Sequence, residues 1–333
     1  MVVSSWVHPE VVELLAPSCA VVPNETGEAL SREQLLARCR AAHGLMTFMP
    51  DCIDEAFLAE CGELRIIACA LKGYDNFDAE ACTRHGIWLS IVPDLLTAPT
   101  AELTIGLMIA LGRNILPGDR LLRSGQFRGW RPMLYGQGID DSTVGLVGAG
   151  AVGKAIARRL AGFRATLLYA ENMALSPDQE DQLRLRRVSQ GELLERSDFV
   201  VLCLPLQPTT RHLVNRDFLA RMKAGAALIN TARGSLVDEV AIADALEAGR
   251  LAGYAADVFS MEDWALADRP KEVSPRLLKS DKTVLTPHLG SAVDRTRREI
   301  ALQAAASILQ ALHGEAPAGA VNRPPSLRQP VRP

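Results

Sequence analysis

Short apolar runs with few polar interruptions alternate with longer stretches of mixed polarity along most of this chain. Such runs are typical of strands covered on both faces, as in a parallel sheet flanked by helices. The alternation therefore predicts an α/β protein built from doubly wound parallel sheets. We expect strands at residues 64–70, 87–92, 143–148, 165–170, 199–204, 226–230, 253–257 and 283–286.

One stretch has a helical pattern and is apolar on nearly every side. Residues 101–113 read AELTIGLMIALGR and follow Pro99 and Thr100. A helix of this kind is buried or lies in an interface between subunits, and its apolar part is too short to span a membrane. We expect Pro117 and Gly118 to end or kink this helix, because proline cannot continue the backbone hydrogen-bond pattern.

Length and composition place the chain among ordinary globular proteins. Its 333 residues suggest two domains, and a net charge of −3 gives no sign of a basic surface for nucleic acid. The seven cysteines show no CxxC or Cys/His spacing, which argues against a zinc site or a disulfide framework. The N-terminus lacks the basic and apolar regions of a signal peptide. We therefore expect a cytoplasmic protein without a metal, nucleic-acid or membrane partner.

A glycine-rich loop follows the expected strand 143–148. Gly148, Gly150 and Gly153 form GxGxxG, and a helix is expected to open at 155–160. The first glycine permits a tight turn, the second permits close approach of a pyrophosphate, and the third permits helix–strand packing. On its own this spacing is a weak signal, because glycine-rich turns are common.

An acidic residue strengthens the signal of the glycine loop. Glu171 follows the next expected strand, at about the 20-residue offset typical of the acid that binds the adenosine ribose. A carboxylate there accepts hydrogen bonds from the ribose hydroxyls and repels a 2′-phosphate. This context favours NAD over NADP, against the alternative of a surface glutamate in a loop.

Polar residues follow three later strands in the segments NTARGSLVDE, GYAADVFSMEDW and TPHLGSA. They include Arg233, Asp257, Glu262 and His288. Ligands of doubly wound sheets bind at the carboxyl ends of the strands, so these side chains are expected to converge. Each residue alone has a structural alternative. These are a surface arginine for Arg233, a strand-end cap for Asp257, a loop acid for Glu262 and a hydrogen-bonded histidine for His288. Together, downstream of a dinucleotide loop, they indicate a catalytic site.

These motifs resemble the D-2-hydroxyacid dehydrogenase family over the whole chain. Within it the resemblance is greatest to the branch of phosphite dehydrogenases. That closer resemblance rests on MTFMPD (46–51), ALKGYDNFD (70–78), VPDLLTAPTAELTIGL (92–107), GWRPMLYG (129–136), GYAADVFSMEDWALADRP (253–270) and TPHLGSAV (286–293). SMEDW stands where hydroxyacid dehydrogenases usually have a proline-containing sequence after DVF, which favours the phosphite branch.

The resemblance implies a role for each matched residue. Arg233 would bind the anionic substrate, His288 would be the general acid/base, and Glu262 would orient the imidazole. Met49, Lys72, Trp130, Tyr135 and Arg297 would form the wall around the substrate. NAD contacts are implied for Lys72, Thr100, Gly148, Gly150, Ala151, Val152, Gly153, Glu171, Cys203, Leu204, Pro205, Thr231, Ala232, Arg233, Asp257 and His288.

The resemblance also implies two Rossmann-like domains, of which the substrate domain is discontinuous. Residues 1–98 and 290–333 would form the substrate domain, and residues 99–289 the NAD-binding domain. A cleft between the domains would close on the substrate, and a homodimer would form largely through the NAD-binding domain. The tail from Asn322 is rich in proline and arginine, so we expect it to be disordered.

The expected reaction is oxidation of phosphite to phosphate, with hydride transfer to NAD. Phosphite is a dianion near neutral pH, so Lys72 is expected to supply a second cation beside Arg233. The alternative for Lys72 is a solvated lysine in a turn. Two other functions stay open: reduction of a 2-keto acid such as glyoxylate or hydroxypyruvate by the same residues, and a non-catalytic protein of this fold that senses NAD(H).

Overall fold

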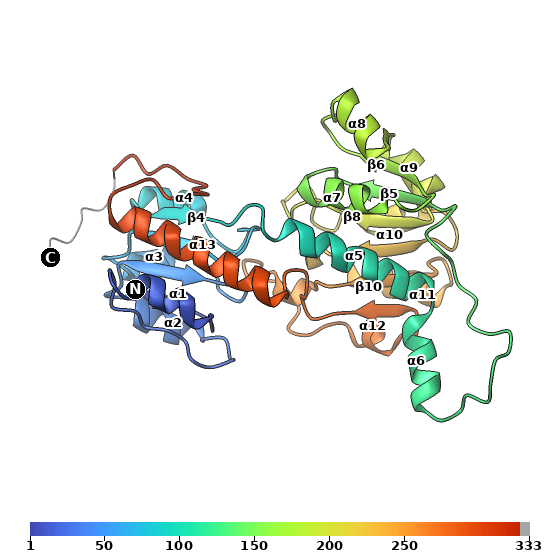
Figure 1. The fold of residues 1–333 in the computed structure, drawn as a ribbon, viewed down its shortest axis with the longest axis horizontal. Coiled ribbons are helices and arrows are strands. Elements are labelled where there is room, and N and C mark those ends of the chain that lie inside the picture. The colour runs from blue at the N-terminus through green and yellow to red at the C-terminus, as the bar shows by residue number, and fades with distance from the viewer. Residues whose placement is uncertain (327–333) are drawn as a thin grey trace. The chain divides into compact units, whose positions relative to one another are not determined.

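A computed structural model describes residues 1–326, which form two compact units. The first unit comprises Met1–Leu96, Trp264–Asp268 and the chain from Ala292 onward. The second comprises Thr97–Asp263 and Arg269–Ser291. In Figure 1 the chain runs from blue to red, so the first unit contains both the blue N-terminal elements and the red helix α13.

The first unit is built on a four-stranded parallel sheet in the order β1-β2-β3-β4. Its strands are short: β1 (Val2–Val3), β2 (Gly44–Thr47), β3 (Ile66–Cys69) and β4 (Trp88–Ser90). The last two confirm the strands expected at 64–70 and 87–92. The first two were not predicted, because runs this short leave little pattern in the sequence.

Helices cover both faces of this sheet. On one face α1 (Pro9–Leu15) and α13 (Asp294–Leu312) pack on Met46, Ile66 and Ala68. The other face is covered by α2 (Arg32–Cys39), α3 (Glu55–Glu60) and α4 (Ala79–Arg84). Side chains of Ser31, Asp54 and Asp78 accept backbone N–H groups of the first turns and so fix where α2, α3 and α4 begin.

The second unit contains a seven-stranded sheet in which every pair is parallel, in the order β11-β10-β9-β8-β5-β6-β7. The strands are β5 (Thr143–Val147), β6 (Thr166–Ala170), β7 (Leu185–Arg187), β8 (Phe199–Leu202), β9 (Ala227–Asn230), β10 (Gly253–Ala256) and β11 (Thr283–Leu285). The strand order reverses between β5 and β8, and ligands of such sheets bind at the carboxyl ends of the strands there. The expected doubly wound α/β fold is confirmed; the polar edge strand β7 was not predicted.

Two helical layers enclose the seven-stranded sheet. One face is covered by α5 (Thr97–Gly112), α7 (Ala151–Leu160) and α8 (Pro177–Leu183). The other is covered by α9 (Gln190–Arg196), α10 (Arg216–Arg221), α11 (Glu239–Glu247) and α12 (Pro275–Lys279). Because both faces are buried, the strands read as continuous apolar runs in the sequence.

The start of helix α5 differs from the prediction. The helix begins at Thr97, so Pro99 lies inside its first turn, where the missing N–H has no helical partner anyway. It ends at Gly112, and Asn114 in a left-handed conformation (φ 51°) breaks the chain direction. Pro117 then lies in the first turn of α6 (Ile115–Arg123). The helix thus ends close to residue 113, as expected, and the break precedes Pro117 because this proline has no N–H to continue the α5 hydrogen bonds.

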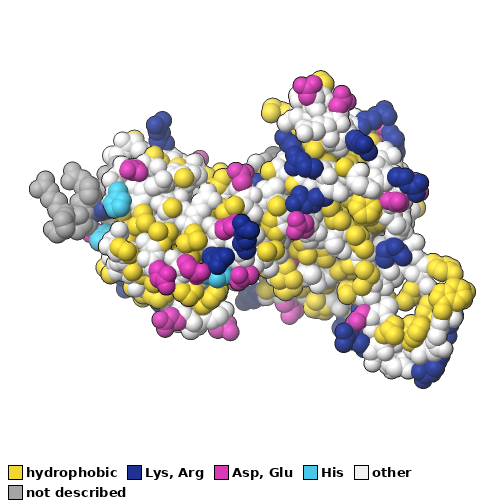
Figure 2. Space-filling view, in the orientation of Figure 1, with side chains coloured by type: hydrophobic (Ala, Val, Ile, Leu, Met, Phe, Trp, Pro, Cys, Tyr) yellow, Lys and Arg dark blue, Asp and Glu magenta, His cyan; other side chains and the backbone are white. Residues whose placement is uncertain are grey.

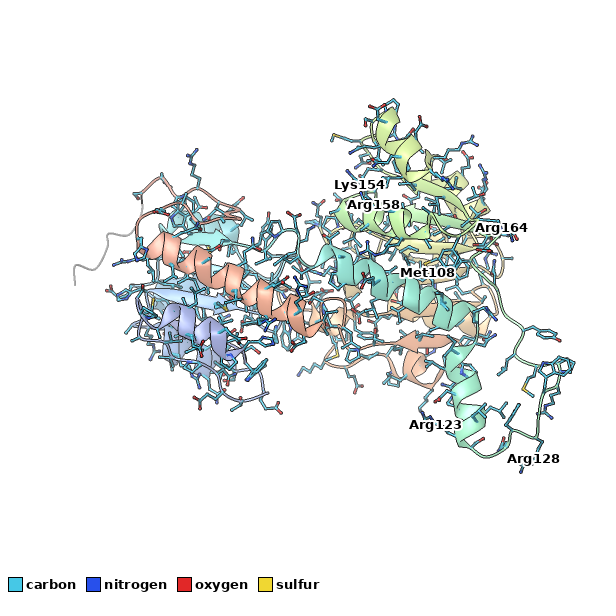
Figure 3. The ribbon with its side chains drawn as sticks, viewed as in Figure 1. Met108, Arg123, Arg128, Lys154, Arg158 and Arg164 are labelled. Atoms are coloured by element: carbon cyan, nitrogen blue, oxygen red, sulfur yellow. The ribbon has the colours of Figure 1, made fainter. Side chains whose placement is uncertain are left out.

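Helix α6 and the extended segment up to residue 138 form an arm that projects from the second unit (Figure 1). None of the α6 residues is buried. Hydrophobic side chains gather over this arm in Figure 2, and they include Ile115, Leu122, Phe127, Trp130, Leu134 and Tyr135. Arg123 and Arg128 point outward from the arm (Figure 3). The arm is thus an exposed surface of mixed apolar and basic character.

The C-terminal segment is ordered at its first residues. Asn322 accepts a hydrogen bond from Leu89 N at 2.8 Å and donates to Ile87 O at 2.9 Å. The expectation of disorder is therefore wrong at Asn322, and residues 327–333 lie outside the described chain. Across the described residues, no helix is long and apolar enough to cross a membrane.

Candidate active site

The glycine-rich loop joins β5 to α7 and needs glycine at its first and third positions. Gly148 has φ 99°, and a Cβ there would lie 2.6 Å from Cys203 O. A Cβ on Gly153 would lie 2.7 Å from Gly148 O. At Gly150 a Cβ would meet no atom within 4 Å, so open space lies in front of this residue. That space lies where a pyrophosphate would approach the backbone.

The N-terminus of α7 faces the same space without a side-chain cap. Gly150 is the N-cap residue and offers no side chain to the amides of Ala151, Val152 and Gly153. Uncapped amides at the positive end of a ten-residue helix suit a bound phosphate. The residues therefore fit the pyrophosphate of a dinucleotide.

A cavity of about 870 Å³ extends from this loop along the carboxyl edge of the sheet. The predicted cofactor residues Gly148, Gly150, Glu171, Cys203, Leu204 and Pro205 all line it. Glu171 lies across the turn, where its Oε2 accepts a hydrogen bond from Ala149 N at 3.2 Å. Arg187, Ser189 and Gln190 also line the cavity, and no sequence pattern indicated them because β7 itself was not predicted.

A second group of predicted residues gathers where β9, β10 and β11 end. Arg233 precedes the 3₁₀ turn η1 (Gly234–Leu236), and Glu262 closes the turn η2 (Ser260–Glu262). These turns are in direct backbone contact, since a Cβ on Gly234 would lie 1.9 Å from Phe259 C. Ser235 N donates to Asp263 Oδ2 at 2.7 Å and fixes the two turns together. Gly234 is therefore required to hold Arg233 against the segment that carries Glu262.

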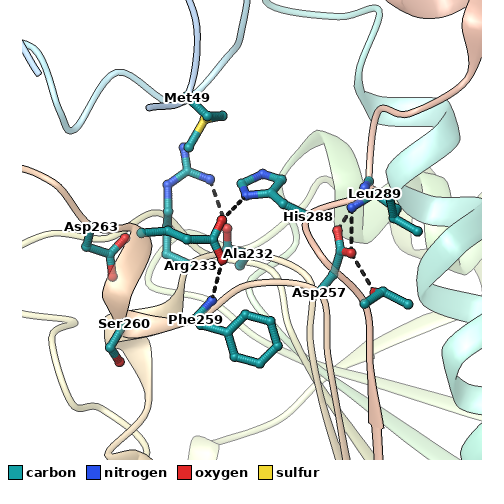
Figure 4. Close-up of polar contacts among 12 residues, drawn as sticks. Met49, Ala232, Arg233, Asp257, Phe259, Ser260, Asp263, His288 and Leu289 are labelled. Atoms are coloured by element: carbon teal, nitrogen blue, oxygen red, sulfur yellow. Dashed lines mark hydrogen bonds and ion pairs between the residues drawn. The ribbon is translucent and has the colours of Figure 1, made fainter. Parts of the chain in front are cut away.

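Glu262 and His288 form an acid–imidazole pair. Glu262 Oε2 lies 2.6 Å from His288 Nδ1, and Glu262 Oε1 accepts a hydrogen bond from Phe259 N at 2.9 Å. With the carboxylate on Nδ1, the Nε2 atom of the ring is the one available for proton transfer. Figure 4 shows the Arg233 guanidinium and the His288 ring turned toward the same point. The arrangement combines a fixed cation with an oriented acid/base.

Asp257 shapes the loop that carries His288. Its Oδ1 accepts hydrogen bonds from Thr286 Oγ1 at 2.6 Å and Leu289 N at 2.7 Å, and its Oδ2 from Gly290 N at 2.8 Å (Figure 4). Burial raises the pKa of this carboxyl, and the hydrogen bonds oppose that effect. His288 itself has a left-handed backbone (φ 56°), which non-glycine residues adopt at an energetic cost.

This role of Asp257 corresponds to the alternative of a strand-end cap, since the residue is only 1% exposed and both of its oxygens hold the 286–290 loop. Its expected place at the nicotinamide stays a prediction. The pairing of β10 with β11 brings the two segments together. An acid at the end of a strand next to a Thr-Pro-His segment is the signal that could have indicated it.

Three further predicted cofactor residues, Thr100, Thr231 and Ala232, lie around this second group. Thr231 Oγ1 is 2.7 Å from Thr104 Oγ1, and Thr104 also donates to Thr100 O. Thr100 Oγ1 donates to Gly290 O at 3.3 Å. Helix α5 is thus tied to β9 and to the loop of His288 through hydroxyl groups. Ala232 is the residue before Arg233 and accepts its Nη1–H at 2.9 Å.

Three predicted substrate residues belong to the first unit. Met49 follows β2, Lys72 follows β3, and the Arg297 Nη1 atom on α13 donates to Ala70 O at 3.3 Å. The Arg297 guanidinium also lies 5.5 Å from the centre of the Phe48 ring, and burial lowers its pKa. Strand ends therefore place Met49 and Lys72 at the carboxyl edge of the four-stranded sheet, and Arg297 reaches the same edge from α13.

Trp130 and Tyr135 lie away from His288, which belongs to the same unit. They belong to the arm and are 84% and 80% exposed. Because the arm projects from the sheet (Figure 1), the chain's own fold does not bring these rings to His288. Their predicted place at the substrate remains untested.

Comparisons with known proteins agree with this geometry. Residues 105–290 match the family described as D-isomer specific 2-hydroxyacid dehydrogenase, NAD binding domain. A glyoxylate reductase of Pyrococcus horikoshii is 37% identical over 88% of this chain and 87% of its own length. A glyoxylate reductase of Thermococcus onnurineus is 36% identical over 90% and 88%.

Solved structures show the same fold along nearly the entire chain. The TT0316 protein of Thermus thermophilus matches with a TM-score of 0.87 and 34% identity, over 96% of this chain and 99% of its own. A glyoxylate reductase of Paecilomyes thermophila matches with a TM-score of 0.83 and 28% identity, over 96% and 97%. The similarity therefore extends through both compact units.

Proposed function

Since the chain belongs to the D-isomer specific 2-hydroxyacid dehydrogenase family, we propose that it transfers hydride between NAD(H) and C2 of a small 2-oxo or 2-hydroxy acid. Glyoxylate is the substrate we favour, because the relatives named above are glyoxylate reductases. The observation that carries the chemistry is the 2.6 Å contact between Glu262 Oε2 and His288 Nδ1, beside Arg233.

Three residues of the second unit would perform the chemistry. The Arg233 guanidinium binds the substrate carboxylate, because its planar fork matches two carboxylate oxygens. His288 Nε2 donates a proton to the carbonyl oxygen in reduction and accepts it from the hydroxyl in oxidation. Glu262 holds the ring and stabilises the imidazolium. NAD, when bound, supplies or accepts the hydride at nicotinamide C4.

A second candidate function is the oxidation of phosphite. The observation that favours it is Lys72, which places an ammonium group after β3 at the carboxyl edge of the four-stranded sheet. A monocarboxylate needs one strong cation, whereas a phosphite dianion needs at least two. None of the relatives named above is a phosphite dehydrogenase, so this function rests on Lys72 and on the motif SMEDW.

One experiment separates these functions. The purified protein is assayed for NADH consumption with glyoxylate and hydroxypyruvate, and for NADH formation with phosphite and with D-2-hydroxy acids. A kcat/KM for glyoxylate far above that for phosphite supports the first function, and the reverse order supports the second. If the protein binds NADH but turns over none of these compounds, both enzymatic functions are wrong and a role in sensing NAD(H) remains.

We also propose that the protein is a homodimer that forms through the arm of the second unit. Phe127, Trp130, Leu134 and Tyr135 are exposed apolar side chains on one continuous segment. Apolar patches of this kind mark interfaces between proteins. A partner subunit would cover these rings, and an arm that reaches the other subunit would explain why Trp130 and Tyr135 lie away from the chain's own site.

A further inference from the structure

Two side chains of opposite charge lie at the end of the cavity where the adenosine of NAD is expected. Glu171 follows β6, and Arg187 is the last residue of β7. The two strands are neighbours, with Tyr169 paired to Arg187 in register. Both charged residues line the cavity, together with Asn172. The carboxyl edge of the sheet thus presents an acid and a base side by side.

The Arg187 guanidinium is held by the turn that carries Glu171. Its Nη2 atom donates to Glu171 O at 2.9 Å and to Asn172 O at 3.0 Å. Within residues 1–326 its Nε and Nη1 atoms make no hydrogen bond, and no carboxylate pairs with it. The cation is therefore fixed in place by neutral carbonyl groups and keeps donors available for a ligand.

The Glu171 carboxylate is held on the other side of the same turn. Its Oε2 accepts from Ala149 N at 3.2 Å, and its Oε1 accepts from Asn172 N at 3.1 Å. The acid therefore points to the glycine loop, where it can accept hydrogen bonds from the ribose hydroxyls. A phosphate on the 2′-oxygen would meet this carboxylate and be repelled, but it would lie beside the arginine as well.

We propose that Arg187 provides a latent binding site for a 2′-phosphate, which the negative charge of Glu171 masks. A guanidinium suits this ligand because its planar fork donates two parallel hydrogen bonds to phosphate oxygens. The site requires no new cation, so removal of one negative charge uncovers it. The inference concerns cofactor recognition, so its outcome is independent of which substrate the enzyme uses.

The test measures binding by calorimetry with 2′,5′-ADP as the probe and ADP as its control. In Glu171→Gln the amide keeps the shape of the side chain and an oxygen for the ribose. We expect the affinity of this variant for 2′,5′-ADP, relative to its affinity for ADP, to exceed the wild-type ratio by at least about tenfold. Added salt should weaken the gain, because the attraction is electrostatic.

A second substitution identifies the cation. The gain should disappear in Glu171→Gln/Arg187→Gln and persist in Glu171→Gln/Arg186→Gln. Arg186 is a matched control, since it is an exposed arginine of the same strand whose side chain points to the opposite face of the sheet and does not line the cavity. The same order of affinities is expected for NADPH, measured by quenching of protein fluorescence.

Three results would overturn the proposal. The first is a Glu171→Gln variant that gains no affinity for 2′,5′-ADP. The second is a gain that survives the loss of Arg187. The third is an Arg187→Gln variant that loses affinity for ADP and for 2′,5′-ADP equally, because Arg187 would then only hold the turn. Thermal unfolding of each variant shows whether the fold is kept.

Discussion

The Glu262 carboxylate lies 2.6 Å from Nδ1 of His288, and the same carboxylate accepts the backbone N–H of Phe259 through its other oxygen. The two residues are 26 positions apart in the sequence and meet because β10 and β11 end at the same edge of the sheet. Glu262 thus has one oxygen for its own turn and one for the imidazole. The contact fixes both the orientation and the tautomer of His288.

Substitutions of His288 and of Glu262 should affect turnover to different extents. His288→Asn should abolish turnover while NADH binding is retained, because the ring serves proton transfer. Glu262→Gln should lower kcat on the order of 10–100-fold, since proton transfer by an oriented group contributes about 10²–10⁴-fold in rate. Steady-state kinetics and titration with NADH test both expectations, and an unchanged kcat in Glu262→Gln would contradict the assigned role.

Asp257 should matter for stability as well as for activity. In Asp257→Asn one carboxylate oxygen becomes an amide group, which cannot accept the N–H of Gly290 or of Leu289. A buried donor left without an acceptor costs about 1–3 kcal/mol. We expect the free energy of unfolding in urea to fall by about this amount, and kcat to fall because the loop of His288 is no longer fixed. Retention of both quantities would show that the loop holds its conformation without this carboxylate.

Asp51 should make stability depend on pH. Its carboxyl is 6% exposed, its Oδ2 accepts hydrogen bonds from Ser4 Oγ and Phe48 N, and burial raises its pKa to about 6. The folded protein then binds the proton more tightly than the unfolded chain, where the pKa is about 3.9. The stabilisation is present below the unfolded value and is lost as pH rises through about 4 to 6. At about 1.36 kcal/mol per unit of pKa, the loss is about 3 kcal/mol.

The neutral variant Asp51→Asn provides the comparison. Its amide oxygen can accept both hydrogen bonds, since both go to a single oxygen in the wild type. The difference in unfolding free energy between wild type and variant should therefore change by about 2 kcal/mol between pH 4 and pH 7, in favour of the variant at high pH. Denaturation curves in urea at these pH values measure it, and parallel pH profiles would show that Asp51 titrates normally.

Lys72 distinguishes the two proposed functions. If phosphite is a substrate, Lys72→Ala should raise KM for phosphite strongly, with a cost on the order of 2–5 kcal/mol for loss of one partner of a buried charge pair. Lys72→Arg should restore part of this, because its planar fork has a different reach. With glyoxylate as substrate, the effect of Lys72→Ala should be smaller, because Arg233 alone can hold a monocarboxylate. Wild-type kinetics of Lys72→Ala with phosphite would make this lysine an ordinary surface residue.

The arm should control the association state. A variant with Phe127, Trp130 and Leu134 replaced by serine should sediment as a monomer at concentrations where the wild type is a dimer. Trp6→Ser is the matched control, because Trp6 is also exposed but belongs to the first unit. Sedimentation velocity distinguishes the species. A monomeric wild type, or a dimer that persists without these side chains, would exclude the arm as the interface.

The α/β class and most of the strands of the second unit could be predicted from the sequence. Strands buried on both faces need continuous apolar residues, and β5, β6, β8, β9 and β10 have them. The roles of the loop glycines could also be predicted, because only glycine tolerates φ 99° at Gly148 or the close approach at Gly153. Resemblance supplied the roles of Arg233, Glu262 and His288, and the structure then showed the contact between Glu262 and His288.

Other features were decided by contacts between segments far apart in the chain. Strands β1 and β7 are too short or too polar to show a pattern, and they exist because a neighbouring strand offers hydrogen-bond partners. Asn322 is ordered because its side chain meets the backbone of β4 and of the residue before it. The helix breaks at Asn114, so Pro117 falls in the first turn of α6, where its missing N–H has no helical partner.

Asp257 and Arg187 show most clearly the difference between what the sequence specifies and what the tertiary structure decides. Each sequence position is compatible with an exposed charge at the end of a strand. Pairing of β10 with β11 makes Asp257 the acceptor for a whole loop, and pairing of β6 with β7 places Arg187 beside Glu171. The sequence specifies which groups carry charge, whereas the register of the sheet decides which backbone groups those charges meet.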